Sequence, residues 1–421
     1  MKLLLLTYGT RGDVEPFLAL ALGLQAAGHD VVVATSSRFR AFVEQRGVPF
    51  HAMSDESLAL IESPEGRRML EGGTGFVRRM AAGVRLSRRA GPINDRLMRQ
   101  TWEAARAHAP DRIVYHSKLF AAPHVAEKLG VPAALAMLQP MMVPTREFPA
   151  MGLPSWPIPG WNRLSYRLVT LGFAAFRKRV NTVRREVLGL GGVKRAREVV
   201  FPPGAGTIPI LHAYSRRVRP EPADWPAEAV VTGYWRLPEA PGFEPEPDLR
   251  AFLADGPPPV FVSFGSMTSA DPSELGALVA GALRRAGCRG IVGSGWADLE
   301  VRTEGEVLAV SSVPYGWLFP RTAAVVHHGG AGTTAAGFHA GVPQVICPFF
   351  GDQPGWAALA HDRGVAVEPL PRKRLTEERL AAAIQRAVGD PGLRVAARGL
   401  ADELAGENGV ARAIEVLEAG G

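Results

Sequence analysis

Cysteine and long apolar runs are scarce in this sequence, and their scarcity excludes whole classes of protein. Only two of the 421 residues are cysteines, Cys288 and Cys347. Two thiols cannot form a disulfide framework or a structural zinc site, so we expect reduced thiols in a cytoplasmic protein. No stretch reaches the roughly 18 apolar residues of a transmembrane helix. The apolar start at residues 1–6 is too short for a signal peptide, and we expect a buried strand there.

The signatures of three common ligand classes are missing as well. The chain has no Gly-Lys-Ser/Thr sequence of a P-loop and no G-x-G-x-x-G of a dinucleotide-binding protein. After the first apolar run the glycines are Gly9 and Gly12, a spacing that argues against a dehydrogenase. The net charge is +7, but neither a nucleic-acid-binding motif nor interleaved aromatic residues accompany it. We therefore expect no nucleic acid as a partner.

Positive charge is concentrated in two segments of the first half. Residues 160–200 contain ten Lys/Arg and two Asp/Glu, a surplus of +8, and residues 67–99 add nine arginines. Such a face is most often only a solvated helix surface. The alternative is peripheral contact of these basic helices with an anionic membrane or an acidic partner. The sequence leaves the oligomeric state open.

Short apolar runs alternate with helical segments in both halves, which predicts parallel sheets covered by helices. Ten strands are expected, at residues 2–7, 29–34, 48–52, 112–116, 133–138, 260–264, 290–293, 307–310, 324–327 and 344–347. Helices are expected at residues 16–27, 39–46, 121–129, 273–285, 332–340, 375–388, 393–404 and 410–417. The first of them would have Pro16 at its start.

A proline-rich stretch separates the two halves. Residues 220–259 contain ten of the 35 prolines, which disfavours regular elements and indicates a linker. We therefore predict the α/β class, with two Rossmann-like doubly wound domains facing a cleft, because open sheets bind ligands beyond their strand ends. The predicted parts are an N-terminal domain at 1–218, a linker at 219–245, a C-terminal domain at 246–400, and helices at 401–421 that pack back on the N-terminal domain.

The most informative segment is the run VVHHGGAGTT from Val325 to Thr334. An apolar strand leads into glycines, which let the backbone approach a phosphate, and the N–H groups at the following helix start would bind the anion. Thr333 and Thr334 could add hydroxyl donors. His327 or His328 could donate to a phosphate oxygen and stabilise a departing diphosphate. The alternative is a tight turn with glycines for packing only, and the flanking histidines and threonines favour the phosphate site.

An Asp-Gln pair follows a later strand, at Asp352 and Gln353. A carboxylate that accepts hydrogen bonds and an amide that both accepts and donates suit the hydroxyl groups of a sugar. The alternative is ordinary turn chemistry.

Together these segments resemble the signature of nucleotide-diphosphate-sugar glycosyltransferases of the two-Rossmann-domain GT-B fold. The likeness is greatest to the bacterial natural-product branch and to the sterol 3-beta-glucosyltransferases, and it extends over nearly the whole chain in the family's order. The stretches that carry it are GTRGDVEP at 9–16, LQPMMVPTREFP at 138–149, SFGSM at 263–267, HHGGAGTT at 327–334 and GDQ at 351–353.

The resemblance implies an inverting transfer of a hexose, with glucose favoured, from a UDP- or TDP-sugar to a lipophilic small-molecule acceptor. It implies no metal and no cofactor besides this co-substrate. The N-terminal domain would bind the acceptor and the C-terminal domain the donor. In this branch the acidic residue of the first motif is the general base, here Asp13, whereas the residue by itself could equally be a helix N-cap.

The same resemblance, residue by residue, gives the donor site. Plant members have a Trp and a Glu where this chain has Ser312 and Ala335, so Trp296 becomes the candidate platform for the nucleotide base. The donor-binding residues are expected to be Thr10, Arg11, Gly12, Ser266, Trp296, Val313, His327, His328, Gly329, Gly330, Ala331, Gly332, Thr333, Asp352 and Gln353.

A segment rich in Met, Pro and aromatic residues at 137–161 could line an apolar acceptor pocket. The alternative is a loop packed on its own core. Residues 54–92 exceed a minimal Rossmann half, and we expect a helical insert that shapes the same pocket. A sterol, a polyketide or a flavonoid would fit. The acceptor-binding candidates are Met137, Gln139, Met141, Met142, Phe148 and Trp156.

Two other functions stay open. One is a nucleotide-sugar epimerase or glycan phosphorylase on the same fold, against which the Asp13 loop and the apolar acceptor segment argue. The other is a non-catalytic partner or activator of another transferase, which should lack the base or the phosphate loop, whereas this chain has both.

Overall fold

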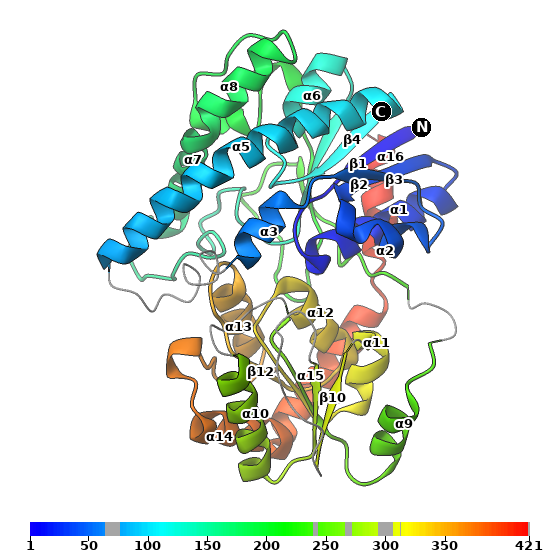
Figure 1. Cartoon of the computed structure of the whole chain (residues 1–421), viewed down its shortest axis with the longest axis vertical. Coiled ribbons are helices and arrows are strands. Elements are labelled where there is room, and N and C mark those ends of the chain that lie inside the picture. Colours follow the sequence, from blue (N-terminus) through cyan, green and yellow to red (C-terminus); the bar gives the residue numbers. More distant parts are fainter. Residues whose placement is uncertain (64–75, 239–242, 266–271, 294–305, 312, 420–421) are drawn as a thin grey trace. The chain divides into compact units, whose positions relative to one another are not determined.

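The computed structural model describes residues 1–63, 76–238, 243–265, 272–293, 306–311 and 313–419, which form two compact units (Figure 1). The first unit comprises residues 1–63, 76–237 and 408–421, and the second comprises residues 238–407. The chain therefore leaves the first unit and returns to it for its last helix. No helix in this described part is long and apolar enough to cross a membrane.

The first unit is built on a seven-stranded sheet with the order β3-β2-β1-β4-β5-β6-β7. All neighbouring strands are parallel, as in a doubly wound Rossmann sheet. The apolar start of the chain forms the central strand, and Leu3 to Leu6 are at most 2% exposed. The strands are β1 (Lys2–Leu6), β2 (Asp30–Ser36), β3 (Phe50–Met53), β4 (Arg112–His116), β5 (Ala133–Met137), β6 (Ile210–His212) and β7 (Ala229–Val231).

Helix α1 begins at Arg11 and not, as predicted, at Pro16. Polar side chains before the proline close the first turn, and Pro16 within the helix lacks only the N–H that would bond to the carbonyl of Gly12. The helices of this unit are α1 (Arg11–Ala26), α2 (Arg40–Glu44), α3 (Glu56–Glu62), α5 (Phe76–His108), α6 (Ala122–Leu129), α7 (Trp161–Gly172), α8 (Arg177–Glu186) and α16 (Gly409–Ala419), with 3₁₀ turns η1 (Ser37–Phe39), η2 (Phe173–Phe176), η3 (Ala196–Val199) and η4 (Pro203–Ala205).

The last helix, α16, packs on α1. Ala413 and Leu417 are buried in the same core as β1. Gly23 on α1 leaves room for Val410, because a Cβ at Gly23 would overlap the valine side chain. The core of the first unit is thus completed by the far end of the chain.

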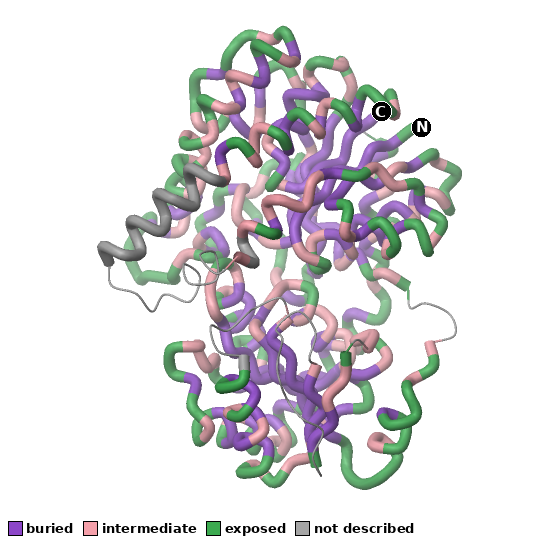
Figure 2. Tube along the Cα trace, in the orientation of Figure 1, coloured by how far each residue is buried: buried purple, intermediate pink, exposed green. Residues whose placement is uncertain are grey.

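The second unit has five parallel strands in the order β10-β9-β8-β11-β12. Alternate residues of β8 point to different apolar cores, Val260 and Val262 to one and Phe261 to the other. In each unit the strands are largely buried, while the helices alternate between buried and exposed residues (Figure 2). The strands are β8 (Val260–Ser263), β9 (Gly290–Gly293), β10 (Val307–Val310), β11 (Ala324–His327) and β12 (Gln344–Ile346). The helices are α9 (Pro247–Ala254), α10 (Pro272–Ala286), α11 (Tyr315–Leu318), α12 (Ala331–Ala340), α13 (Gln353–Asp362), α14 (Glu377–Gly389) and α15 (Pro391–Ala405), with 3₁₀ turns η5 (Phe319–Arg321) and η6 (Arg372–Arg374).

The structure confirms the α/β class with two doubly wound sheets and contains all ten predicted strands. Strands β6 and β7 were not predicted, because a three-residue strand is too short to show an alternating pattern. Strand β7 lies inside the proline-rich stretch that we interpreted as a linker, and the chain leaves the first unit only at Leu237. The predicted cleft between the sheets stays a prediction.

Candidate functional site

The strand order of the first sheet reverses between β1 and β4, and open α/β sheets bind ligands beyond the strand ends at such a switch point. Two charged side chains meet there. Asp13 comes from the first turn of α1, which follows β1, and Lys118 comes from the loop that follows β4. The Nζ atom of Lys118 lies 2.7 Å from Oδ1 of Asp13.

Asp13 also closes the start of α1. The Thr10 backbone N–H donates to Oδ2 of Asp13 at 2.8 Å, and the Thr10 hydroxyl lies 3.3 Å from the same oxygen. With Thr10 as N-cap, this arrangement is a capping box. The alternative that Asp13 is itself the N-cap is wrong, because Thr10 holds that position and Asp13 is the third residue of the helix, where it completes the capping box. The capping box occupies one carboxylate oxygen and leaves Oδ1 to face other partners.

His116, the last residue of β4, approaches the same oxygen. It is 1% exposed, and its Nε2 lies 3.4 Å from Oδ1 of Asp13. Its Nδ1 accepts the backbone N–H of Lys118 at 3.2 Å, so a neutral ring carries its proton on Nε2, toward Asp13. Burial lowers the pKa of His116 to about 4, although Asp13 raises it. The ring is therefore neutral at neutral pH, with Nε2 close to the Asp13 carboxylate.

Asp13 is ionised at neutral pH although its side chain is only 15% exposed. Burial alone would raise the pKa of Asp13. The Lys118 ammonium, the His116 ring and the Thr10 N–H outweigh burial and hold this pKa below its usual range. The carboxylate is thus in the state in which it can accept a proton.

Gly9 makes room for this cluster. Its φ of +145° lies in the region that favours glycine. A Cβ at Gly9 would overlap the Asp13 carboxylate and would lie 2.8 Å from Nζ of Lys118. Any other residue at this position would therefore displace the charged pair.

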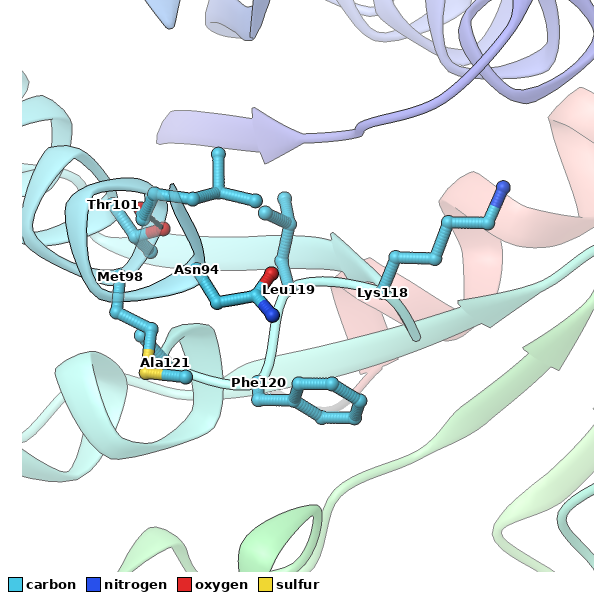
Figure 3. A pocket seen from close by; sticks show the side chains of 8 residues that line it. Asn94, Met98, Thr101, Lys118, Leu119, Phe120 and Ala121 are labelled. Carbon is cyan, nitrogen blue, oxygen red and sulfur yellow. Dashed lines mark hydrogen bonds between the residues drawn. The ribbon is translucent and has the colours of Figure 1, made fainter. Parts of the chain in front are cut away.

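A small pocket adjoins the cluster, with walls from α5 and from the loop between β4 and α6 (Figure 3). The Lys118 side chain extends away from the apolar lining in Figure 3, so one residue belongs both to the pocket and to the Asp13 pair. The cavity volume is only about 10 Å³, room for about one water molecule, so the pocket is far smaller than a site that encloses a drug-sized ligand. The lining residues are Asn94, Leu97, Met98, Thr101, Lys118, Leu119, Phe120 and Ala121.

The second sheet has its own switch point, between β8 and β11. The loop after β8 contains Gly265 with φ +61°, and the loop after β11 contains Gly329 with φ +88°. A Cβ at Gly329 would lie 2.8 Å from Ile346 and 3.1 Å from the backbone oxygen of Gln353. The glycine-rich run predicted to bind phosphate therefore lies where a ligand is expected, and its Gly329 has a backbone conformation that favours glycine.

His327 is bonded within the protein through both ring nitrogens. Its Nε2 lies 2.7 Å from Oε1 of Gln344, and its Nδ1 accepts the Gly329 N–H at 3.0 Å. It is fully buried, and burial lowers the pKa of His327 to about 4 despite the bond with Gln344. The sequence left open which histidine meets a phosphate. His327 has no ring nitrogen left for one and holds the glycine loop instead.

His328 lies in a slot between two glycines. A Cβ at Gly265 would lie 2.8 Å from its Cε1, and a Cβ at Gly330 would lie 2.5 Å from its Nε2. Burial, with a smaller effect of His327, lowers the pKa of His328 to about 3, so its ring is neutral. Its buried Nδ1 has no hydrogen-bond partner among the residues that the structure describes, which is uncommon for a buried polar atom. Of the two histidines, His328 therefore stays the predicted phosphate donor.

Helix α12 begins at Ala331, with Gly330 as its N-cap. The N–H groups of its first turn have no helical carbonyl before them and form the positive end of the helix dipole. The Thr334 hydroxyl donates to the carbonyl of Gly330 at 2.9 Å, so its proton is used inside the helix. Thr333 and the N–H groups from Gly330 to Thr333 remain as the predicted phosphate donors.

Asp352 and Gln353 stabilise the start of α13. The Oε1 atom of Gln353 accepts the backbone N–H groups of Phe349 at 2.8 Å and Phe350 at 3.2 Å. The Oδ2 atom of Asp352 accepts from the indole of Trp356 at 2.9 Å. Turn chemistry, the alternative considered for this pair, is present, and contact with a sugar stays a prediction.

Two of the six acceptor candidates belong to the core of the first unit. Met137 is 1% exposed within β5, and Phe148 is 8% exposed and packs on Tyr166. The Arg219 guanidinium covers the Phe148 ring at 4.2 Å. The alternative of a segment packed on its own core holds for these two residues, because their types are as typical of a core as of a pocket.

The other four candidates lie nearer the surface. Gln139, Met141 and Met142 follow the end of β5 and are half-buried. Trp156 is 48% exposed and stacks on Trp161 with ring centroids 4.3 Å apart. Acceptor contact by these four residues stays a prediction.

The remaining donor candidates also stay predictions. Ser266 and Trp296 lie outside the described residues. Val313 is half-buried just after β10, and the exposed Arg11 pairs with Glu15 at 2.9 Å. Among the described residues no group of three or more His, Cys, Asp and Glu side chains could hold a metal ion.

Sequence reasoning missed Lys118, His116 and the pocket beside them. One signal could have found them: the carboxyl ends of parallel strands share one edge of a sheet. Polar residues after the predicted strand at 112–116 therefore had to lie near the loop that contains Asp13.

Known protein families match both units. Residues 3–145 match the glycosyltransferase family 28 N-terminal domain, and residues 299–419 match the erythromycin biosynthesis protein CIII-like C-terminal domain. The chain is 37% identical to O-mycaminosyltylonolide 6-deoxyallosyltransferase of Streptomyces fradiae, over 99% of this chain and 97% of the relative. It is 34% identical to a sterol 3-beta-glucosyltransferase of Arabidopsis thaliana, over 99% of this chain and 65% of the relative.

Solved structures share the fold at lower identity. The glycotransferase of kitacinnamycin superimposes with a TM-score of 0.70 at 20% identity, covering 99% of this chain and 98% of that one. Glycosyltransferase VinC in complex with dTDP superimposes with a TM-score of 0.65 at 20% identity, covering 99% of both chains. With the identity to the curated relatives, these likenesses show that the chain belongs to the GT-B glycosyltransferases, in the family that contains macrolide glycosyltransferases and sterol 3-beta-glucosyltransferases.

Proposed function

We propose that this glycosyltransferase moves a hexose from a nucleotide-diphosphate sugar to a hydroxyl of a lipophilic acceptor, with inversion at the anomeric carbon and Asp13 as general base. The observation that carries the proposal is the state of the Asp13 carboxylate at the first switch point. It is ionised, its Oδ2 accepts the Thr10 N–H, and its Oδ1 faces the exchangeable Lys118 ammonium. A positioned carboxylate of this kind is what proton abstraction from an alcohol requires.

In the proposed step the acceptor hydroxyl takes the place of Lys118 at Oδ1. As the hydroxyl oxygen bonds to the anomeric carbon, the bond from that carbon to the diphosphate oxygen breaks and the hydroxyl proton passes to Asp13. The Lys118 side chain is 49% exposed, so its ammonium can move into water when the hydroxyl takes its place. The Thr10 N–H at Oδ2 keeps the carboxylate oriented during the exchange.

The leaving diphosphate is assigned to the second switch point. The N-terminus of α12 and the neutral His328 ring would donate to its oxygens as negative charge develops. The orphan Nδ1 of His328 supports this assignment. Neutralisation by these groups is the basis on which we propose a metal-independent transfer.

The names of relatives guide the choice of donor. The Streptomyces relative is named for a 6-deoxyhexose and the sterol relatives for glucose, and VinC is described in complex with dTDP. We propose a hexose, with glucose as the first sugar to test and UDP and TDP as the two nucleotides.

The acceptor is proposed to be a large alcohol, either a sterol or a polyketide-like macrolide, since the names of the relatives point to both. The pocket beside Lys118 holds only about 10 Å³, room for about one water molecule, so most of such an acceptor would have to bind outside it. The half-buried Met141 and Met142 after β5 would offer further adaptable apolar surface.

The test is to incubate the protein with UDP-glucose or TDP-glucose and a panel of sterols, macrolide aglycones and flavonoids, and to measure product masses. A gain of one hexose on an acceptor is the expected result, and NMR of the product should show the inverted anomer. Donor turnover without any acceptor would instead indicate an epimerase. Donor binding without turnover across the whole panel would indicate a non-catalytic partner of another transferase.

A further inference from the structure

Large exposed apolar side chains gather in one short part of the first unit. Seven such side chains are exposed in the described part of the chain, and five of them lie between residues 156 and 171. Their exposed fractions range from 45% to 65%. We call these five residues the docking face: Trp156, Ile158, Leu164, Leu168 and Leu171.

Helix α7 presents three of these side chains in one row. Leu164, Leu168 and Leu171 are spaced by four and three residues, which places them along one side of a helix. The opposite side is buried through Tyr166, whereas Trp161 begins the leucine side of the helix and is covered by Trp156. The leucine row is therefore not the core-facing stripe of the helix. It is a second apolar stripe that the first unit leaves in solvent.

Trp156 extends the row at the start of α7. Its ring stacks on Trp161, and the indole N–H of Trp161 donates to the carbonyl of Pro154 at 2.7 Å. The exposed indole is thus held in a fixed place. A tryptophan with one wet and one apolar side is typical of the boundary between water and lipid.

Only positive charge accompanies these side chains along the chain. Residues 148–185 contain seven Lys/Arg and no Asp/Glu. Arg163 and Arg167 are exposed on α7 next to the leucine row, and Arg177 and Lys178 are exposed at the start of α8. Arg163 also bonds to Asp224 at 3.2 Å. An apolar stripe bordered by arginines and lysines matches an anionic lipid surface, to which both stripe and border contribute binding free energy.

We propose that the docking face binds an anionic lipid bilayer, with α7 lying in the plane of the membrane interface. Charge complementarity decides between this occupant and a second copy of the chain. A two-fold contact through the same face would set the arginines of one copy opposite those of the other, which is unfavourable.

The docking face continues into the pocket described above. The 3₁₀ turn η2 follows α7 directly, and its Phe173 and Phe176 lie against Phe120 with ring centroids 5.8 and 4.4 Å apart. Phe120 lines the pocket that Lys118 shares with Asp13. In the part of the inference that rests on the proposed function, a membrane-dissolved acceptor reaches Asp13 along this apolar path.

The test is vesicle flotation of the full chain without any nucleotide sugar or acceptor. The vesicles are phosphatidylcholine alone or phosphatidylcholine with about a third phosphatidylglycerol, at low and high salt. The test variant is L168E/L171E, which changes exposed positions only. The matched control is V395E, because Val395 is 71% exposed on α15 of the second unit. Circular dichroism checks the fold of each variant.

We expect the wild type and V395E to float with the anionic vesicles, less at high salt, and L168E/L171E to bind roughly tenfold more weakly or worse. Equal binding of L168E/L171E and wild type, or no binding by the wild type, would overturn the proposal. Self-association lost in L168E/L171E, without vesicle binding, would assign the face to a second copy and also overturn it. Turnover of a water-soluble acceptor by L168E/L171E should equal that of the wild type, so the proposed function is judged separately.

Discussion

The two switch points are formed by the same arrangement of strands but contain different groups: a charged pair at the first and neutral donors at the second. At the first, between β1 and β4, a carboxylate and an ammonium lie 2.7 Å apart. At the second, between β8 and β11, glycines surround a neutral histidine at a helix N-terminus. A carboxylate takes a proton only in its charged form, whereas a site for a diphosphate can rely on neutral donors because its ligand brings the charge. The shared backbone fixes the place, and the few residues after each strand decide the chemistry.

Removing the charge at the first switch point is expected to have the largest effect. Asp13→Asn keeps the side-chain shape but cannot accept a proton, so turnover should fall by about 10²–10⁴-fold while binding of the nucleotide sugar stays near the wild-type value. Initial rates and calorimetric titration measure the two quantities. Asp111→Asn is the control, since Asp111 precedes β4 at the opposite strand end and caps the N–H of Lys2. A fully active Asp13→Asn enzyme would contradict the assigned base.

At the second switch point, substituting each of the two consecutive histidines separates a ligand-binding role from a structural one. His328→Ala should weaken catalysis or diphosphate binding by about 10–10³-fold with little change in stability. His327→Ala should instead lower the free energy of unfolding by about 1–3 kcal/mol, because it leaves Oε1 of the buried Gln344 without a partner. Thermal unfolding and nucleotide titration of both variants separate the two roles. An equal loss of stability in both variants would show that the histidines do not differ as proposed.

Adding a methyl group at a glycine of each switch point should have a smaller effect, on kcat at the first and on donor binding at the second. Gly9→Ala would push Asp13 aside, and Gly330→Ala would push against His328. We expect Gly9→Ala to lower kcat and Gly330→Ala to weaken donor binding, each by roughly 10–100-fold. Steady-state kinetics with varied donor concentration distinguishes the two patterns. The same pattern in both variants would mean that the two sites are not separable.

The smallest predicted effect is a displaced pH profile. Lys118→Met removes the ammonium that favours the charged form of Asp13, so the pKa of that carboxyl should rise. The acid limb of kcat/KM should therefore move to higher pH, with a rate near the wild-type value where Asp13 is already ionised. Binding of the nucleotide sugar should change little along this limb, since His328 with a pKa of about 3 stays neutral. If the acid limb of kcat/KM stays at the wild-type pH, Lys118 does not lower the pKa of Asp13 as proposed.

The sequence predicted the short motifs and missed the contacts between residues that are far apart in the chain and are brought together by the strand order. The glycine-rich run and the Asp13 loop each lie within ten residues, so their motifs could be recognised. The partner of Asp13 is Lys118, far along the chain, and it comes close only because β4 pairs with β1. The sequence alone could not distinguish the roles of His327 and His328, because they are identical neighbours in the same motif. One ends strand β11 and is buried, whereas the next residue lies in the slot between two glycines.

The return of α16 to the first unit has a consequence for how the protein is made. While residues 238–407 are being synthesised, the surface of α1 that will hold Val410 has no covering helix. At roughly 5–20 residues per second this interval lasts on the order of ten seconds or more. The nascent first unit therefore has the α1 surface uncovered throughout this interval, while the second unit has all its strands and can close its own cores first.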